Sequence, residues 1–137
     1  MHELALAEAV VAAALDAAER EGLASLEGIG VRVGELQRIT RDVFEFALRE
    51  VLPAAELRLA GTRIDVEVEP ARLRCRACAR AFALAEAAGA PTPDELEAIH
   101  FVPELAHGFL RCPACGSPDF QVLAGRGVSI AWIRGSP

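Results

Sequence analysis

The chain has 137 residues, a formal net charge of −6 at pH 7 and 53% hydrophobic residues, which fits one globular domain with at most a small appended module. We do not expect so acidic a protein to bind nucleic acid or anionic membranes, because phosphate contacts need clustered cations. The sequence shows neither a secretory signal nor the roughly 20 apolar residues that span a bilayer. We therefore expect a cytoplasmic protein.

Helix and strand patterns alternate through the first half of the sequence. Residues 4–21 place apolar side chains at helical spacing, which predicts an amphipathic helix that Gly22 ends. Alternation over residues 29–33 predicts a short, half-buried strand. Thr40 is a candidate N-cap for a second helix, and Pro53 is expected to end it.

The rest of the sequence contains three more strand patterns and one capped helix. Residues 64–68 alternate as a strand does. Thr92 and Glu95 form a capping box, which predicts a short helix behind it. Strand alternation then returns at residues 120–122 and 128–132.

These patterns predict an α+β fold with a small mixed three-stranded sheet, two helices and an inserted four-cysteine zinc-ribbon module. The α/β core is assigned to residues 1–72 and 119–137, and the zinc-binding module with its helical insertion to residues 73–118. The return of strand periodicity near the C-terminus favours a module inserted into one core.

Two C-x-x-C pairs predict one structural zinc ion. A tight C-x-x-C turn supplies two thiolates, and four thiolates close a tetrahedral shell with no position open for water. A redox dithiol and an iron site are the alternatives, but two such pairs favour zinc. We expect Arg74, Arg76 and Arg111 to offset the negative charge of a four-thiolate site. The predicted zinc ligands are Cys75, Cys78, Cys112 and Cys115.

The amino terminus is a candidate site for a second metal. The amine of Met1 and the amide and imidazole nitrogens of His2 can chelate one ion, and Glu3 could add an amide nitrogen or a supporting carboxylate. Three nitrogens in one plane suit Ni²⁺ or Cu²⁺. Taken alone, His2 is more often an ordinary residue near a chain end.

Several motifs together resemble the HypA/HybF family of hydrogenase maturation proteins. They are Met1-His2-Glu3-Leu4-Ala5-Leu6-Ala7, Val33-Gly34-Glu35-Leu36, and the two cysteine pairs, the second in the form Cys-Pro-x-Cys-Gly. The resemblance covers nearly the whole chain. It implies a nickel metallochaperone that delivers Ni²⁺ for [NiFe]-hydrogenase, and in some members for urease. It also implies nickel at Met1, His2 and Glu3, structural zinc on the cysteines, and two partners: a HypB-type GTPase and the hydrogenase large subunit.

One departure from the usual family pattern affects the nickel site. The cysteine pairs are separated by 33 residues, Ala79 to Arg111, where many members have a short spacer. This segment contains His100 and His107, either of which could be an ordinary surface histidine. We predict that His100, which follows the capped helix, supplies the fourth nickel ligand.

Two other functional classes fit the sequence less well. A zinc ribbon for nucleic acid needs a basic face that carries aromatic residues, and a metal-dependent hydrolase needs a His/carboxylate cluster around a water site. With 3 His, 6 Phe and 1 Trp, the chain favours neither. We therefore expect a carrier without enzymatic turnover, and we expect its partner to dock on the N-terminal core beside Glu8.

Overall fold

The chain folds into two compact units in a computed structural model that describes residues 2–89, 92–102 and 106–137. The first unit comprises Met1–Arg32, Ile39–Glu67 and Val128–Pro137, and the second comprises Val33–Arg38 and Val68–Gly127. The second unit is thus larger than the module expected at residues 73–118, because it takes in a short segment before the second helix and the strand that follows the last cysteine.

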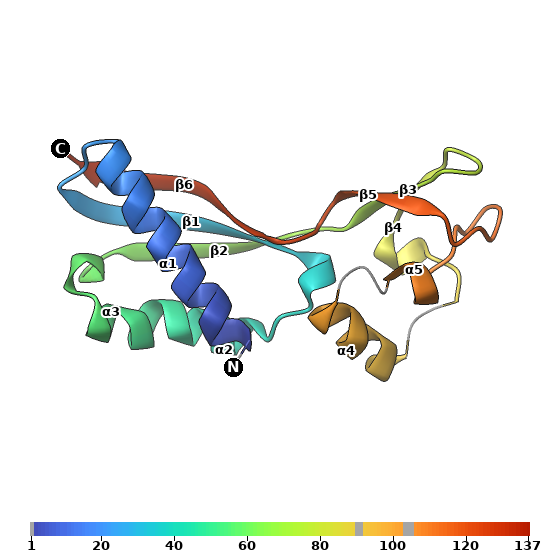
Figure 1. Ribbon diagram of the computed structural model, residues 1–137, viewed down its shortest axis with the longest axis horizontal. Helices are drawn as coiled ribbons and strands as arrows, with labels where there is room; N and C mark the ends of the chain where they lie inside the picture. The colour runs from blue at the N-terminus through green and yellow to red at the C-terminus, as the bar shows by residue number, and fades with distance from the viewer. Residues whose placement is uncertain (1, 90–91, 103–105) are drawn as a thin grey trace. The chain divides into compact units, whose positions relative to one another are not determined.

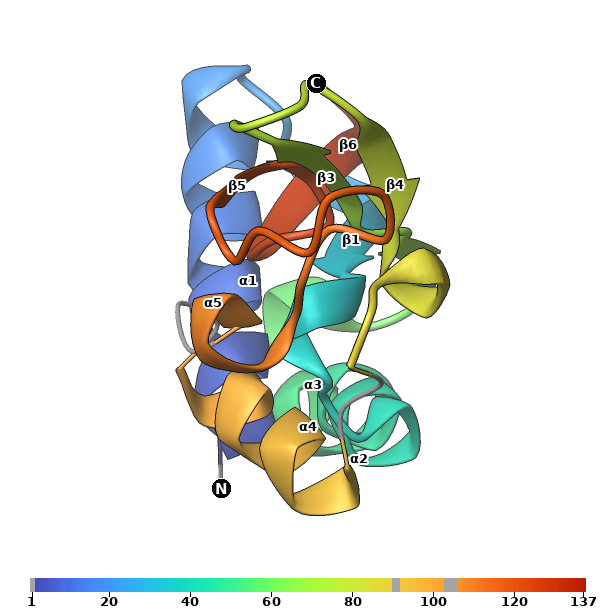
Figure 2. The ribbon, with the colours of Figure 1, turned by 90° about the vertical axis from the view of Figure 1, so that its right-hand side faces the viewer.

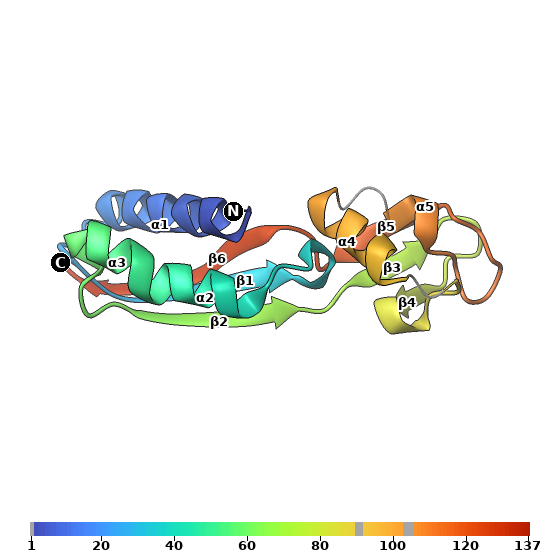
Figure 3. The same ribbon diagram turned by 90° about the horizontal axis from the view of Figure 1, so that it is seen from below.

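The first unit is built on a three-stranded sheet in the order β2-β1-β6. Its strands are β1 (Ser25–Gly34), β2 (Arg63–Glu69) and β6 (Val128–Ser136). The arrows of β1 and β2 run in one direction and that of β6 runs in the other (Figure 3), so the sheet is mixed, as predicted.

All the helices of this unit cover one face of that sheet (Figure 3). They are α1 (His2–Arg20), α2 (Arg41–Phe46), a π-helical turn η2 (Ala47–Val51), α3 (Leu52–Ala55) and the 3-10 turn η3 (Leu57–Leu59). α1 lies across β1 and β6 (Figure 1) and buries the predicted apolar stripe, with Ala7, Val11 and Ala14 almost inaccessible.

Two helix ends show how local chemistry sets the boundaries. α1 ends at Arg20, and Gly22 stops it as predicted. Gly22 has a φ of 71°, and the N–H of Leu23 donates to the Ala18 carbonyl oxygen at 2.9 Å. The second helix, in contrast, continues past Pro53 to Ala55. A π-helical turn precedes Pro53, and such a turn has its own hydrogen-bond register, so a residue without an amide proton can be accommodated.

The opposite face of the sheet explains two glycines in β1. The indole of Trp132 lies over Gly28 and Gly30, so closely that a Cβ atom on Gly30 would collide with the ring. Gly30 is therefore buried between two buried neighbours, Ile29 and Val31. The strand is covered on both faces here, which simple alternation did not predict.

The second unit contains an antiparallel sheet in the order β4-β3-β5. Its elements are η1 (Glu35–Gln37), β3 (Arg72–Cys75), β4 (Ala81–Ala83), η4 (Leu84–Glu86), α4 (Pro93–Phe101), α5 (Ala106–Phe109) and β5 (Phe120–Ala124). Figure 2 views this unit from the end that carries both cysteine loops. The predicted capping box is present at α4, where the Glu95 N–H donates to Thr92 Oγ1 at 3.2 Å.

The strand after the last cysteine, β5, belongs to the sheet of the second unit and not to the β2-β1-β6 sheet. β5 pairs with β3, with Leu73 opposite Val122 and Cys75 opposite Phe120. The pairing places Phe120 against Phe82 in an edge-to-face contact with ring centroids 6.0 Å apart. These rings form the centre of a small core of buried residues that also includes Leu36 and Leu110.

Two carboxylates fix the chain where β3 begins and β5 ends. Glu35 Oε1 accepts the N–H of Ala71 at 2.8 Å, and Glu69 Oε1 accepts the N–H of Gly125 at 2.6 Å. Gly125 has a φ of 90°, and a Cβ atom there would collide with the Ala71 backbone. The bend between β5 and β6 therefore requires glycine at position 125.

Candidate metal centre

Each cysteine pair sits on a tight turn closed by backbone hydrogen bonds. The Ala79 N–H donates to the Cys75 carbonyl oxygen at 2.9 Å, and the Gly116 N–H donates to the Cys112 carbonyl oxygen at 2.9 Å. The two turns leave the same end of the β4-β3-β5 sheet (Figure 1). The antiparallel register of β3 and β5 thus brings together two motifs that are far apart in the sequence.

The four sulfurs converge on one point. Cys75 Sγ lies 3.5 Å from Cys115 Sγ, and Cys78 Sγ lies 3.6 Å from Cys112 Sγ. All four ligand atoms lie within 4.8 Å of one another. The corners of a ZnS₄ tetrahedron with Zn–S bonds of about 2.3 Å are about 3.8 Å apart. The cluster therefore fits a closed, structural zinc site.

The two turns share one backbone conformation, although their sequences differ. Gly116 has a φ of 76°, and Ala79, at the corresponding position of the first turn, has a φ of 65°. Glycine adopts this left-handed region readily, whereas alanine is strained there. The first turn thus folds like the second despite the missing glycine.

Backbone N–H groups stabilise the thiolate form of Cys112, which is the form that binds a metal. The N–H groups of Cys115 and Ala114 lower the pKa of Cys112 to about 6, and Cys112 is fully buried. The Ser117 N–H stabilises the Cys115 thiolate, but hydrogen bonds among the sulfurs and loss of solvating water outweigh it and raise the pKa of Cys115 to about 12. Without metal, the cluster therefore shares protons among crowded sulfurs, and a divalent cation displaces them.

The arginines near the site are only partly available to balance thiolate charge. Arg76 Nη1 pairs with Asp119 Oδ1 at 3.1 Å, and Arg80 pairs with Glu86 at 3.5 Å. Arg74 and Arg111 make no ion pair within the described part of the chain.

The residues predicted for nickel are described only in part. Met1 and the side chains of His2, His100 and His107 lie outside the described residues. Glu3 is described in the first turn of α1, where it is 8% exposed and its Oε1 accepts the Thr40 N–H at 3.1 Å. This contact joins the start of α1 to the start of α2, and the sequence offered no signal for it.

A family model described as "Hydrogenase/urease nickel incorporation, metallochaperone, hypA" matches residues 1–135. The chain belongs to the HypA family. Its relatives include the hydrogenase maturation factors HypA of Thermococcus onnurineus and Pyrococcus abyssi. Each is 44% identical over 134 residues, which cover 98% of this chain and 95% of the relative. Membership makes this chain a hydrogenase maturation factor of a nickel metallochaperone family.

The HypA fold is also found in solved structures. The nickel metallochaperone HypA from Helicobacter pylori superposes with a TM-score of 0.63 at 18% identity, covering 98% of this chain and 97% of that one. A second HypA solution structure gives a TM-score of 0.60 at 19% identity. At these identities the likeness concerns the fold. No described helix is long and apolar enough to cross a membrane.

The segment Val33-Gly34-Glu35-Leu36 has a structural role that sequence reasoning missed. Its Glu35 binds the Ala71 N–H, and its Leu36 is buried beside Phe82 and Cys75 in the core of the cysteine-bearing unit. The Leu36 N–H also donates to the Gly125 carbonyl oxygen at 2.9 Å. A Glu and a Leu between strand and helix patterns gave no local indication of these long-range contacts.

Proposed function

We propose that this protein binds Ni²⁺ at its amino terminus and delivers it for [NiFe]-hydrogenase maturation, without enzymatic turnover. Urease is a second candidate client. Nickel would be held by Met1, His2 and Glu3, with His100 as the fourth ligand on the sequence argument alone. The zinc ion on Cys75, Cys78, Cys112 and Cys115 would be structural. We expect the protein to act in the cytoplasm with a HypB-type GTPase and the hydrogenase large subunit.

Membership of the HypA family carries this proposal, and the start of α1 supports it. The helix begins at His2, and the first amide groups of a helix have no intrahelical acceptor. The amide nitrogen of His2 can therefore release its proton to solvent and bind a metal without loss of a hydrogen bond of the helix.

The Glu3 carboxylate has a positioning role in the proposed site. Because it is buried and accepts the Thr40 N–H, it holds the first turn of α1 against the start of α2. The Glu3 side chain then fixes the backbone that carries the nickel-binding nitrogens of Met1 and His2.

A nickel titration of the untagged protein tests the proposal. We expect one Ni²⁺ per chain with the visible absorption bands of square-planar nickel, and loss of both in His2→Ala. An extension at the N-terminus should abolish binding in the same way, because it removes the free amine. Unchanged affinity in both the His2→Ala and the extended protein would show that nickel binds elsewhere. Zinc content measured in parallel confirms that the variants are folded.

A further inference from the structure

A groove of about 460 Å³ lies between α1 and the α3–η3 segment, inside the first unit. Its lining is apolar along the middle, where Val11 and Leu15 of α1 and Leu52 of α3 contribute. Val11 is 6% exposed, whereas Leu15 and Leu52 are half-buried. Just beside the groove, Leu57 is 82% exposed. Apolar surface therefore remains accessible between and beside these helices.

Carboxylates outnumber cations on the rim of this groove. Glu8, Asp16 and Glu19 from α1 and Glu56 from the end of α3 line it, with one lining cation, Arg58. Asp16 also pairs with Arg20 at 3.1 Å. The Glu8 carboxylate makes no ion pair or hydrogen bond within the described residues. An apolar floor with a negative rim is complementary to a basic, amphipathic ligand.

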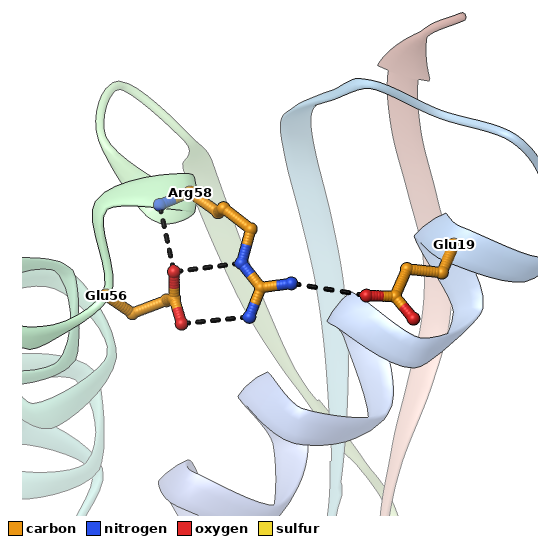
Figure 4. Close-up of polar contacts among 3 residues, drawn as sticks. All are labelled: Glu19, Glu56 and Arg58. Carbon is orange, nitrogen blue, oxygen red and sulfur yellow. Dashed lines mark hydrogen bonds and ion pairs between the residues drawn. The ribbon is translucent and has the colours of Figure 1, made fainter.

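Arg58 shows how this rim holds a guanidinium group (Figure 4). Its Nε and Nη2 donate to the two carboxylate oxygens of Glu56 at 2.9 and 3.0 Å, and its Nη1 reaches Glu19 Oε1 at 3.4 Å. The Arg58 side chain lowers the pKa of Glu56 to about 2. Arg58 is therefore bound in bidentate fashion by Glu56 and more loosely by Glu19.

We propose that this groove docks a basic amphipathic helix of a partner protein, with apolar side chains on the floor and arginine or lysine side chains on the carboxylate rim. Glu8 and Glu19 are three helical turns apart, about 16 Å along α1. Three turns suit a helix that lies in a groove and inserts residues at i, i+3 or i+4, and i+7. A cation of the partner would take Glu19 from Arg58, which keeps Glu56.

A second copy of this chain does not offer such a helix among its described residues. The described helical segments of nine or more residues are α1, α4 and the continuous run of α2, η2 and α3 over residues 41–55. The two arginines of that run, Arg41 and Arg49, are both paired with Glu45 of the same run. α1 carries Arg20 as its single basic residue of the Arg or Lys type, and α4 carries three carboxylates and no arginine. This proposal rests on the proposed function only in that the groove gives the nickel carrier a docking surface. The nickel ligands do not line the groove.

The test uses the full-length protein and a fluorescently labelled synthetic peptide of about 16 residues, long enough to form a helix. The peptide is built from Ala, Leu and Arg in an amphipathic pattern, and a scrambled peptide of the same composition is the control. Anisotropy at low and high salt reports the affinity. We expect the amphipathic peptide to bind and the scrambled peptide to bind at least about tenfold more weakly.

Four variants separate the groove from general charge attraction. Glu8→Arg should weaken binding by about fivefold, since it reverses a rim charge. Ala12→Gln, at an exposed position lining the groove, should weaken it about tenfold by filling the space. Arg58→Ala should tighten it by about threefold, because it removes the competing cation. Glu50→Arg, outside the groove and also exposed, should change it by less than about twofold.

Each other outcome would overturn the proposal. Absence of binding, equal binding of the scrambled peptide, or equal weakening by Glu50→Arg would leave only non-specific charge attraction. Weaker binding after Arg58→Ala would contradict the charge complementarity on which the proposal rests, because removal of a cation from the groove should favour a basic peptide. Sedimentation that shows a dimer disrupted by Ala12→Gln would assign the groove to a second copy. Nickel titrations of the same variants should match wild type, so loss of the groove and loss of the nickel site are distinguishable.

Discussion

Exchanging glycine and alanine between the two cysteine turns should change zinc affinity in opposite directions. Gly116→Ala places a Cβ atom at a φ of 76°, where no other atom lies within 4 Å, so strain acts without a clash. Alanine in this conformation costs about 1–2 kcal/mol, partly offset because glycine loses about 0.5–1 kcal/mol more than alanine in backbone entropy on folding. The net destabilisation should be about 1 kcal/mol.

Ala79→Gly should have the opposite effect for the same reason. Ala79 is exposed and has a φ of 65°, so glycine there relieves strain without loss of packing. We expect stabilisation by about 0.5–1 kcal/mol. Because a structural zinc site couples metal binding to folding, Gly116→Ala should weaken zinc about fivefold and Ala79→Gly should tighten it about two- to fivefold, which is about 1 kcal/mol or less.

Competition with a zinc chelator at fixed pH measures both effects. Gly61→Ala is the matched control, since Gly61 has a φ of 76° and open space around it but lies in the first unit. It should lower the thermal stability of that unit and leave zinc affinity unchanged. A shift of zinc affinity in the same direction for Gly116→Ala and Ala79→Gly would refute the argument from backbone strain.

Three further changes test other parts of the structure. Glu56 should titrate near pH 2 by NMR, and Arg58→Ala should return its pKa towards 4.5. Because the pKa of Glu56 is lowered in the folded state, the stability that this pair contributes is present above about pH 4.5 and is lost as the pH falls towards 2. An unchanged Glu56 pKa in the variant would contradict the Glu56–Arg58 contact. Cys112→Ala should lose zinc and increase hydrogen exchange across the β4-β3-β5 sheet, since closed four-cysteine sites contribute folding free energy. Retention of one zinc per chain would argue against a site that needs all four thiolates. His2→Ala should abolish nickel binding, whereas His100→Ala should weaken it modestly, because water can replace one ligand. An unchanged nickel affinity and visible spectrum in His100→Ala would remove that residue from the site.

The sequence by itself determined the features that depend on local chemistry. The spacing Cys-x-x-Cys predicted the zinc ligands because two thiolates from one tight turn suit a tetrahedral ion, and the structure gathers those sulfurs. Helical periodicity located α1, and the capping box at Thr92 located α4. Together with the N-terminal motif, these local signals were enough to indicate the HypA family.

The tertiary structure alone decided the features that depend on contacts between distant residues. β5 has the same alternation whether it joins β1 or β3, and its register with β3 follows from burying Phe120 against Phe82. Ala79 adopts a left-handed conformation because its turn must present two sulfurs, although its own sequence disfavours it. The burial of Glu3 against Thr40 likewise requires two helix starts to meet. Local patterns report the preferences of a few neighbouring residues, whereas strand partners, buried carboxylates and interhelical grooves are set by which distant surfaces pack together.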